Sequence, residues 1–205
     1  MKNKKLIQFV ESFVLLPMMT IAMPLGNVPK VGVIDQIPQI VLSQKQNIEA
    51  NGLFAFNQAV DQKAKTLETQ AKAIDAYYAE RDMPLASMGM KMAIEAEKNG
   101  IDWRLVAAIS VIESTGGKQA CRKVTHSFLG WGSCKINFES AEKSIEIVSW
   151  NLGGGNPNTD QYYKGKTTKE ILLKYNPPSI VPNYSQKVMS VMEKIGPEII
   201  ITENA

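Results

Sequence analysis

Histidine and cysteine are both scarce in this chain. Its 205 residues include one histidine, His126, and two cysteines, Cys121 and Cys134. A structural zinc site takes four ligands of these types, so these three residues do not complete one. A cysteine paired with His126 is the other reactive combination, but no motif that orients such a pair surrounds either cysteine. The sequence therefore predicts neither a metal ion nor another cofactor.

A large excess of one charge is also absent. Lysine and arginine total 23, and aspartate and glutamate total 20, which gives a net charge of +3. Lys2, Lys4 and Lys5, offset by Glu11, lie in residues 1–25, so the rest of the chain carries only about +1. This balance is not that of a nucleic-acid-binding surface, and no nucleic-acid partner is predicted. The 44% hydrophobic and 21% charged content is typical of a globular domain.

No apolar run has the length of a typical membrane-spanning helix. Residues 13–25 are apolar and uncharged, but a helix of this length rises only about 20 Å, less than the roughly 30 Å of a bilayer core. The run follows a basic head, so residues 1–26 are predicted to be an export signal. A membrane anchor through residues 6–26 is the alternative. Both hypotheses place the protein in the periplasm, in the cell envelope or outside the cell.

The two cysteines are relevant to the predicted export of the protein. An exported protein meets an oxidising environment, where Cys121 and Cys134 could close a short loop. Such a disulfide would contribute about 3 kcal/mol to stability by the chain-entropy model. Two cysteines give no framework of spacings, so a disulfide and two free thiols are both open.

Alternating strand patterns are nearly absent, and the sequence predicts an all-α protein. The predicted segments are a Pro- and Gly-rich linker at 27–42, a helical spacer at 43–83, a compact domain at 84–197 and a tail at 198–205. Helix-forming residues and the Gly, Pro, Ser, Thr and Asp signals at their ends predict helices at 43–81, 85–99, 103–115, 140–152, 167–174 and 183–195.

Apolar residues form a narrow stripe on the predicted spacer helix. They are Phe56, Val60, Leu67, Ile74 and Tyr78. Their spacing places them along one side of a helix. Such a stripe packs either against the domain that follows or against a second copy of the chain, so self-association through residues 43–81 is an alternative to a simple spacer.

Glu113 is the candidate catalytic residue. It lies near the end of the predicted helix 103–115, on the edge of the apolar face that includes Leu105, Ile109 and Ile112. Partial burial and the negative end of the helix dipole both favour the neutral form of a carboxyl group. We therefore expect a raised pKa, as glycosidic cleavage requires of its acid. The alternative is an ordinary solvated glutamate.

Four short segments carry the most specific pattern in the chain. They are Glu113-Ser114-Thr-Gly, Ser127-Phe128-Leu-Gly130-Trp131-Gly, Tyr175-Asn176-Pro, and Tyr184 with Val188 four residues later. In this order they resemble the lysozyme-like superfamily, particularly the lytic transglycosylases, and the second segment is similar to a loop of endo-N-acetylglucosaminidase-like members. The resemblance covers about residues 85–195. It implies a lysozyme-like helical domain that cuts the glycan strands of peptidoglycan.

The resemblance also implies roles for single residues. Glu113 is expected to be the acid, Ser114 a neighbour that steadies the cleft, Tyr175 a hydrogen-bond partner of the acid and Trp131 a platform for a sugar ring. The other residues that it places in substrate binding are Ser127, Phe128, Asn176 and Tyr184. Core packing is the alternative for Trp131 and Tyr175, because large aromatic side chains are mostly buried.

The chain departs from the transglycosylase pattern at two places. It has Gly130-Trp131-Gly132-Ser133 where that family usually has Gly-Leu-Met-Gln, and Pro178 where the family usually has glycine. The subclass within the superfamily therefore stays open.

The sequence also leaves the partner of the acid open. Glu139, Glu142 and Asp160 follow Glu113, but spacing places none of them across a cleft. The favoured hypothesis is cleavage by a single acid between N-acetylmuramic acid and N-acetylglucosamine, leaving a 1,6-anhydro ring, as the resemblance implies. Hydrolysis by a muramidase or endo-N-acetylglucosaminidase is one alternative, and a non-catalytic peptidoglycan-binding or assembly protein is another.

Overall fold

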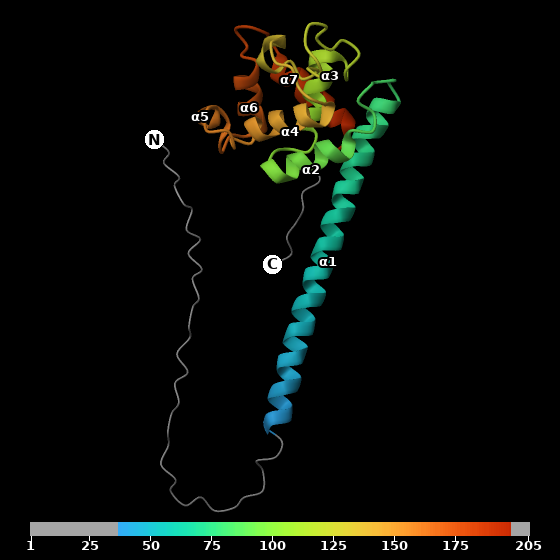
Figure 1. Ribbon diagram of the computed structural model, residues 1–205, viewed down its shortest axis with the longest axis vertical. Coiled ribbons are helices and arrows are strands. Elements are labelled where there is room, and N and C mark those ends of the chain that lie inside the picture. The colour runs from blue at the N-terminus through green and yellow to red at the C-terminus, as the bar shows by residue number, and fades with distance from the viewer. Residues whose placement is uncertain (1–36, 198–205) are drawn as a thin grey trace, which may run out of the picture. The chain divides into compact units, whose positions relative to one another are not determined.

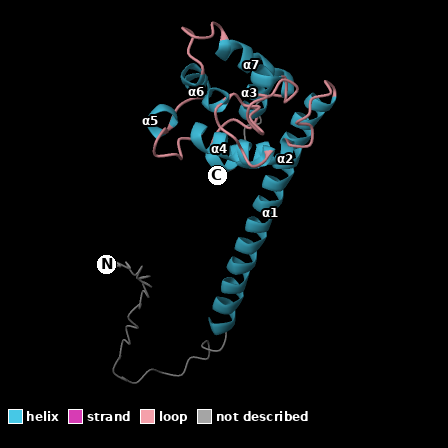
Figure 2. Ribbon diagram, turned by 45° about the horizontal axis from the view of Figure 1, so that its top comes forward, coloured by secondary structure: helices cyan, strands magenta, loops and turns pink. Residues whose placement is uncertain are grey.

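The structure, a computed structural model, describes residues 37–197, with side chains at residue 55 and from residue 57 onward. Its elements are α1 (Ile37–Ala79), α2 (Gly89–Asn99), α3 (Leu105–Ser114), the 3-10 helix η1 (Trp131–Cys134), α4 (Ala141–Leu152), α5 (Asp160–Tyr163), α6 (Thr168–Tyr175) and α7 (Tyr184–Ile195). Every element in this range is helical (Figures 1 and 2), which confirms the all-α prediction.

Several predictions concern residues beyond this range. The export signal or anchor, residues 27–36 of the predicted linker and the tail at 198–205 lie outside the described residues. The remaining linker residues begin α1. No helix among the described residues has both the length and the apolar character that a membrane crossing requires. By its internal contacts the chain divides into Met1–Glu49 and Ala50–Ala205, and the core lies in the second unit.

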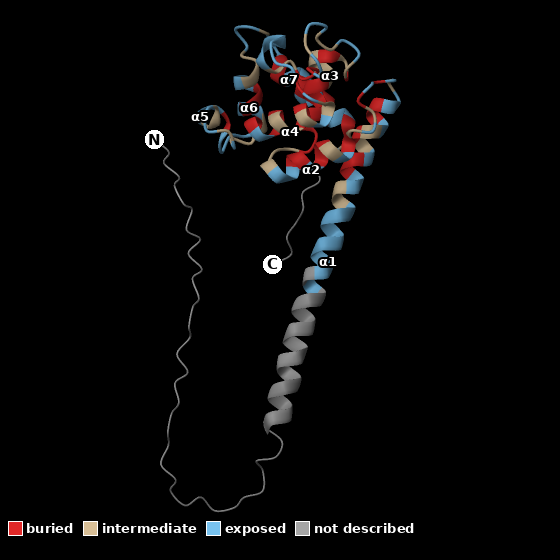
Figure 3. Cartoon of the chain, viewed as in Figure 1, coloured by how far each residue is buried: buried red, intermediate tan, exposed pale blue. Residues whose placement is uncertain are grey.

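The core is built around α3. Residues Leu105, Val106, Ala107, Ala108 and Ile109 have no exposed surface, so this stretch of the helix is enclosed on all sides. α3 packs against α7, α2 against α4, and α6 against both α5 and α7. Figure 3 shows the buried residues gathered on these helices and on the C-terminal end of α1. The result is a helical domain whose loops connect the ends of packed helices.

The last turns of α1 belong to this core. Ile74 and Tyr78 of the predicted stripe are fully buried, and the Tyr78 hydroxyl lies 2.7 Å from Ser110 Oγ and donates to the Ala107 carbonyl at 3.1 Å. Val60 of the same stripe is 50% exposed. The domain core thus includes the last turns of α1, which come before the predicted domain start at residue 84. The exposed part of α1 comes before these turns.

Most helix ends follow the predicted signals. Gly100 ends α2 in the left-handed region, Ser140 caps α4 by accepting from the Lys143 N–H, and Thr167 forms a capping box with Glu170 at the start of α6. The start of α2 differs from the prediction. It begins at Gly89 because Asp75 of α1 accepts from the N–H groups of both Ser87 and Gly89, at 2.9 and 2.8 Å.

Two short helices were missed by the prediction. η1 spans four residues, and one of them, Gly132, has a positive φ. α5 also spans four residues, and it lies between a turn rich in Gly and Asn and Gly165. Their lengths give no period that a sequence pattern can show. α3 also begins two residues later than predicted, because Asp102 caps the preceding turn by accepting from the Arg104 N–H.

Replacing Ile74 by alanine tests whether the end of α1 belongs to the domain. Ile74→Ala removes a fully buried side chain and should lower the free energy of unfolding by about 2–5 kcal/mol. Val60→Ala, on the same helix but half-exposed, should change it by no more than about 0.5 kcal/mol. Urea unfolding followed by circular dichroism measures both. Equal losses in the two variants would contradict this packing.

Candidate functional site

Glu113 is the penultimate residue of α3, and its side chain is partly buried. The hydroxyl of Tyr184, the first residue of α7, donates a hydrogen bond of 2.6 Å to Glu113 Oε1. Burial raises the pKa of Glu113 above its ordinary value, and the hydrogen bond from Tyr184 opposes that rise in part. The direction is the one expected from the sequence, and desolvation is its main cause.

A loop at residues 127–130 closes over the other carboxylate oxygen. Gly130 has φ of 71°, and a Cβ built on it would lie 2.3 Å from Glu113 Oε2. Only glycine combines this backbone conformation with so close an approach to a side chain. Gly130 therefore allows the main chain to cover the acid, and it is a site residue that the sequence analysis did not single out.

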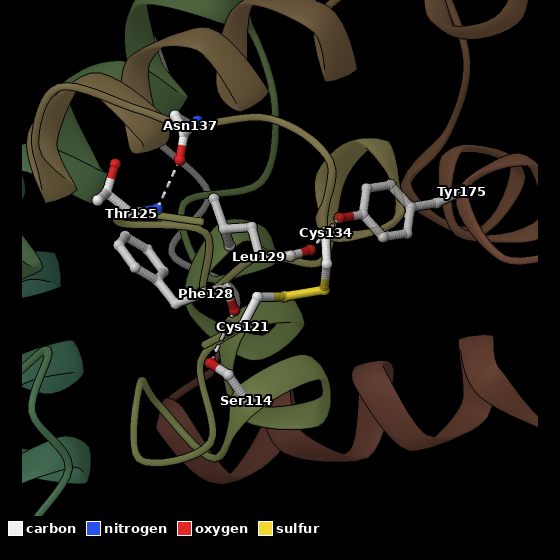
Figure 4. Close-up of a disulfide and its surroundings, with 8 residues drawn as sticks. All are labelled: Ser114, Cys121, Thr125, Phe128, Leu129, Cys134, Asn137 and Tyr175. Carbon is white, nitrogen blue, oxygen red and sulfur yellow. Dashed lines mark hydrogen bonds between the residues drawn. A yellow bond between two sulfur atoms is a disulfide. The ribbon is translucent and has the colours of Figure 1, made fainter. Parts of the chain in front are cut away.

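Hydrogen bonds fix this loop to the helices around it (Figure 4). The Ser114 hydroxyl donates to the Phe128 carbonyl at 2.7 Å and accepts from the Gly117 N–H at 3.0 Å. The Tyr175 hydroxyl donates to the carbonyl of Leu129. Because Phe128 and Leu129 directly precede Gly130, these bonds set the position of the backbone that lies on Glu113.

A disulfide joins the two ends of the segment that contains this loop. Cys121 and Cys134 are bonded, with their Cα atoms 5.8 Å apart (Figure 4). Within the segment the Cys121 N–H donates to the Ser127 carbonyl. The Thr125 N–H donates to Oδ1 of Asn137, three residues beyond the disulfide, at 3.0 Å. The cross-link limits the conformations open to residues 121–134, including Gly130 and Trp131.

A row of aromatic rings leads away from Glu113. Tyr184 and Tyr175 are stacked, with centroids 6.1 Å apart and an interplanar angle of 15°. Tyr175 contacts Trp131 at 5.8 Å, and Trp131 contacts Tyr163 at 6.2 Å. These rings come from α7, α6, η1 and α5. Tyr184 and Tyr163 are only 3% and 8% exposed, so the row is largely packed into the core beside the acid.

Trp131 also lines a hollow of about 170 Å³. The other residues of this hollow are Ile136, Asn137, Phe138, Glu139, Lys143 and Ile147. It combines an aromatic and aliphatic wall with an amide, a carboxylate and an ammonium group. Such a mixture suits a ligand with both apolar faces and hydroxyl groups.

One predicted role is wrong. Tyr175 was expected to be the hydrogen-bond partner of the acid, but its hydroxyl is bonded to the Leu129 carbonyl, and Tyr184 donates to Glu113 instead. The reason is the packing of α7 on α3, which brings the first residue of α7 to the end of α3. Tyr175 keeps a place at the site through its stacking on Tyr184.

The remaining predicted substrate-binding residues divide into two groups. Ser114, Ser127 and Phe128, and likewise Tyr184, are at most 4% exposed, so these side chains are too buried to form a ligand-binding surface. Trp131 and Asn176 are partly buried, and Asn176 ends α6. Trp131 is therefore the member of the predicted set whose ring both touches the site aromatics and lines a hollow.

Three carboxylates were considered as partners of the acid: Glu139, Glu142 and Asp160. Glu139 lines the same hollow as Trp131. Glu142 lies in the first turn of α4, where a hydrogen bond from Ser140 lowers its pKa, and Asp160 starts α5 and accepts from the Gln161 N–H. No group of three or more His, Cys, Asp or Glu side chains among the described residues is arranged to hold a metal ion.

No protein family, curated protein or solved structure matches this chain.

Removing the hydroxyl of Tyr184 tests what controls the protonation of Glu113. The hydroxyl donates to the carboxylate and so favours its charged form. Tyr184→Phe should therefore raise the pKa of Glu113 further. NMR titration of the labelled glutamate carboxyl group measures this pKa. Tyr162→Phe is the matched control, because it removes the hydroxyl of a tyrosine on α5 that contacts Tyr163 and has no part in holding Glu113 or the loop over it. A lower pKa in Tyr184→Phe would contradict the assigned hydrogen bond.

Replacing Gly130 should move the pKa in the opposite direction. A methyl group at this position has no room beside Glu113 Oε2, so the carboxylate or the loop must shift toward solvent and the pKa should fall toward its ordinary value. Gly100→Ala is the control, because Gly100 also has a positive φ of 63° but has nothing within 4 Å of a built Cβ. Both variants should lose about 1–2 kcal/mol of stability from backbone strain, whereas only Gly130→Ala should change the titration.

Proposed function

We propose that this protein cleaves the glycan strands of peptidoglycan, with Glu113 as the general acid. The observation that carries the proposal is a partly buried glutamate with a raised pKa, held between the Tyr184 hydroxyl and the Gly130 backbone beside a row of aromatic rings. A carboxyl group that stays neutral at higher pH can protonate the leaving oxygen of a glycosidic bond. The resemblance of the segments around Glu113, Trp131, Tyr175 and Tyr184 to lytic transglycosylases supports the same activity.

The surroundings of Glu113 suit both halves of a transglycosylation. In the first half, burial favours the neutral acid, which gives its proton to the bridging oxygen as the bond to C1 of N-acetylmuramic acid breaks. In the second half, the carboxylate takes a proton from the 6-hydroxyl of the same sugar as that oxygen bonds to C1. Tyr184 stabilises the charged form between the two steps, and no water is consumed.

Trp131 supports the binding of a sugar strand. Its ring is held between Tyr163 and Tyr175 and also lines the hollow that contains Asn137 and Glu139. A flat aromatic ring beside amide and carboxylate groups matches the apolar face and the hydroxyl rim of a sugar. The bond between Cys121 and Cys134 agrees with an exported location, because disulfides persist in oxidising compartments.

Hydrolysis is the second candidate, and Glu139 is the residue that favours it. This carboxylate lies in the same hollow as Trp131. Glycoside hydrolases use a second carboxylate as a nucleophile or to activate water. The two reactions leave different ends on the strand, a 1,6-anhydro ring after transglycosylation and a reducing sugar after hydrolysis.

Glu113→Gln tests the proposed acid. The amide is similar in size and can still accept from Tyr184, but it has no proton to give, so the rate of wall cleavage should fall by about 10²–10⁴-fold. Zymography with embedded peptidoglycan and mass spectrometry of the products measure the rate and the type of end. Glu139→Gln should leave kcat unchanged and affect at most KM if anhydro ends are formed, because Glu139 then only contacts the sugar.

Three results would count against parts of this proposal. Full activity in Glu113→Gln would reject the assigned acid. Reducing ends, together with loss of activity in Glu139→Gln, would establish the hydrolase. Binding to walls without any cleavage by the wild-type protein would indicate a non-catalytic wall-binding protein.

A further inference from the structure

A second hollow, of about 340 Å³, lies on α5, α6 and the segment that joins them. Its lining residues are Gln161, Tyr162, Lys166, Glu170, Leu173 and Lys174. None of them has a part in the proposed cleavage reaction. The hollow falls within the size range of small-ligand sites.

The hollow combines apolar surface with positive charge. Tyr162 and Leu173 are large apolar residues that are 41% and 37% exposed. The Lys174 ammonium lies 4.1 Å from the centroid of the Tyr162 ring, which holds a cation at the edge of the apolar surface. Lys166 adds a second ammonium group.

One oxygen of the single carboxylate in the hollow is already engaged. Glu170 accepts from the N–H and the hydroxyl of Thr167, at 2.9 and 2.8 Å, as part of the cap of α6. The hollow therefore offers a ligand two cations, one carboxylate whose Oε2 is occupied, an amide and two apolar side chains, so that positive charge exceeds negative charge by one. This set is complementary to a small molecule or chain segment with carboxylates and short apolar side chains.

Ring contacts connect this hollow to the surroundings of the acid. Tyr162 touches Tyr163 at 6.5 Å, Tyr163 touches Trp131 at 6.2 Å, and Trp131 touches Tyr175 at 5.8 Å. The hollow is thus no more than three ring contacts from Tyr175.

We infer that the hollow binds the short acidic peptide stem of the peptidoglycan strand that Glu113 cuts. This inference rests on the proposed function. The carboxylates of the stem pair with Lys166 and Lys174, and its small apolar side chains lie on Tyr162 and Leu173. The consequence is a preference for strands that still carry their peptides over strands from which the peptides have been removed.

The test compares two substrates of the full chain: peptide-bearing strands and the same strands stripped by an amidase. Lys166→Gln with Lys174→Gln should lower kcat/KM on peptide-bearing strands about fivefold, through KM, because two solvent-exposed ion pairs are lost. Cleavage of stripped strands should not change. Lys169→Gln with Lys187→Gln removes the same charge from exposed positions of α6 and α7 outside the hollow and should leave both substrates unaffected.

Equal losses on both substrates, an equal loss in the control variant, or no loss at all would overturn the inference. So would competition by a phosphate-rich wall polymer in place of the released peptide. If the wild-type chain does not cut walls, or if Glu113→Gln cuts normally, the proposed function fails separately. NMR titration of the full chain with the released peptide then decides: weaker binding in the Lys166→Gln, Lys174→Gln variant supports the hollow as the site, and no binding to the wild-type chain rejects it.

Discussion

The hydrogen bond from Tyr184 to Glu113 links the packing of the domain to the chemistry of its candidate site. It joins the end of α3, the most enclosed helix of the core, to the first residue of α7, and these two helices pack on each other. The same packing that buries the carboxyl group brings the hydroxyl that stabilises its charged form. Burial has the larger effect, so the pKa of Glu113 is raised.

This arrangement has a cost in stability whose sign follows from proton linkage. The pKa of Glu113 is higher in the folded than in the unfolded chain. At a pH between these two pKa values the folded chain therefore keeps a proton that the unfolded chain has lost. Folding stability therefore decreases as the pH rises from the ordinary pKa of a glutamate through the raised one. Above that range the ionised carboxyl group opposes folding, and the Tyr184 hydrogen bond offsets part of the effect. A site that keeps an acid neutral thus lowers the stability of its own fold.

Local patterns predicted the helices well and the contacts between them poorly. The starts of α4 and α6 were predictable because each helix is capped by residues next to it in the sequence. Ser140 caps α4, and Thr167 and Glu170 cap α6. The start of α2 was not predictable, because its cap, Asp75, comes from α1. The same distinction holds at the site. The apolar face of α3 indicated the burial of Glu113, whereas the choice of Tyr184 over Tyr175 as its donor depends on a pair 71 residues apart.

Gly130 shows why a motif can indicate a site without giving its geometry. In the sequence it is one glycine before a tryptophan, and many turns have such a pair. In the structure its positive φ and missing Cβ let the main chain lie against Glu113, while Ser114, Tyr175 and the disulfide hold the loop there. Each of these restraints comes from a different part of the chain, and each acts on the backbone of the loop. The acid is consequently positioned by main chain that three separate restraints fix, which explains how a short, buried loop between helices supplies one wall of a site.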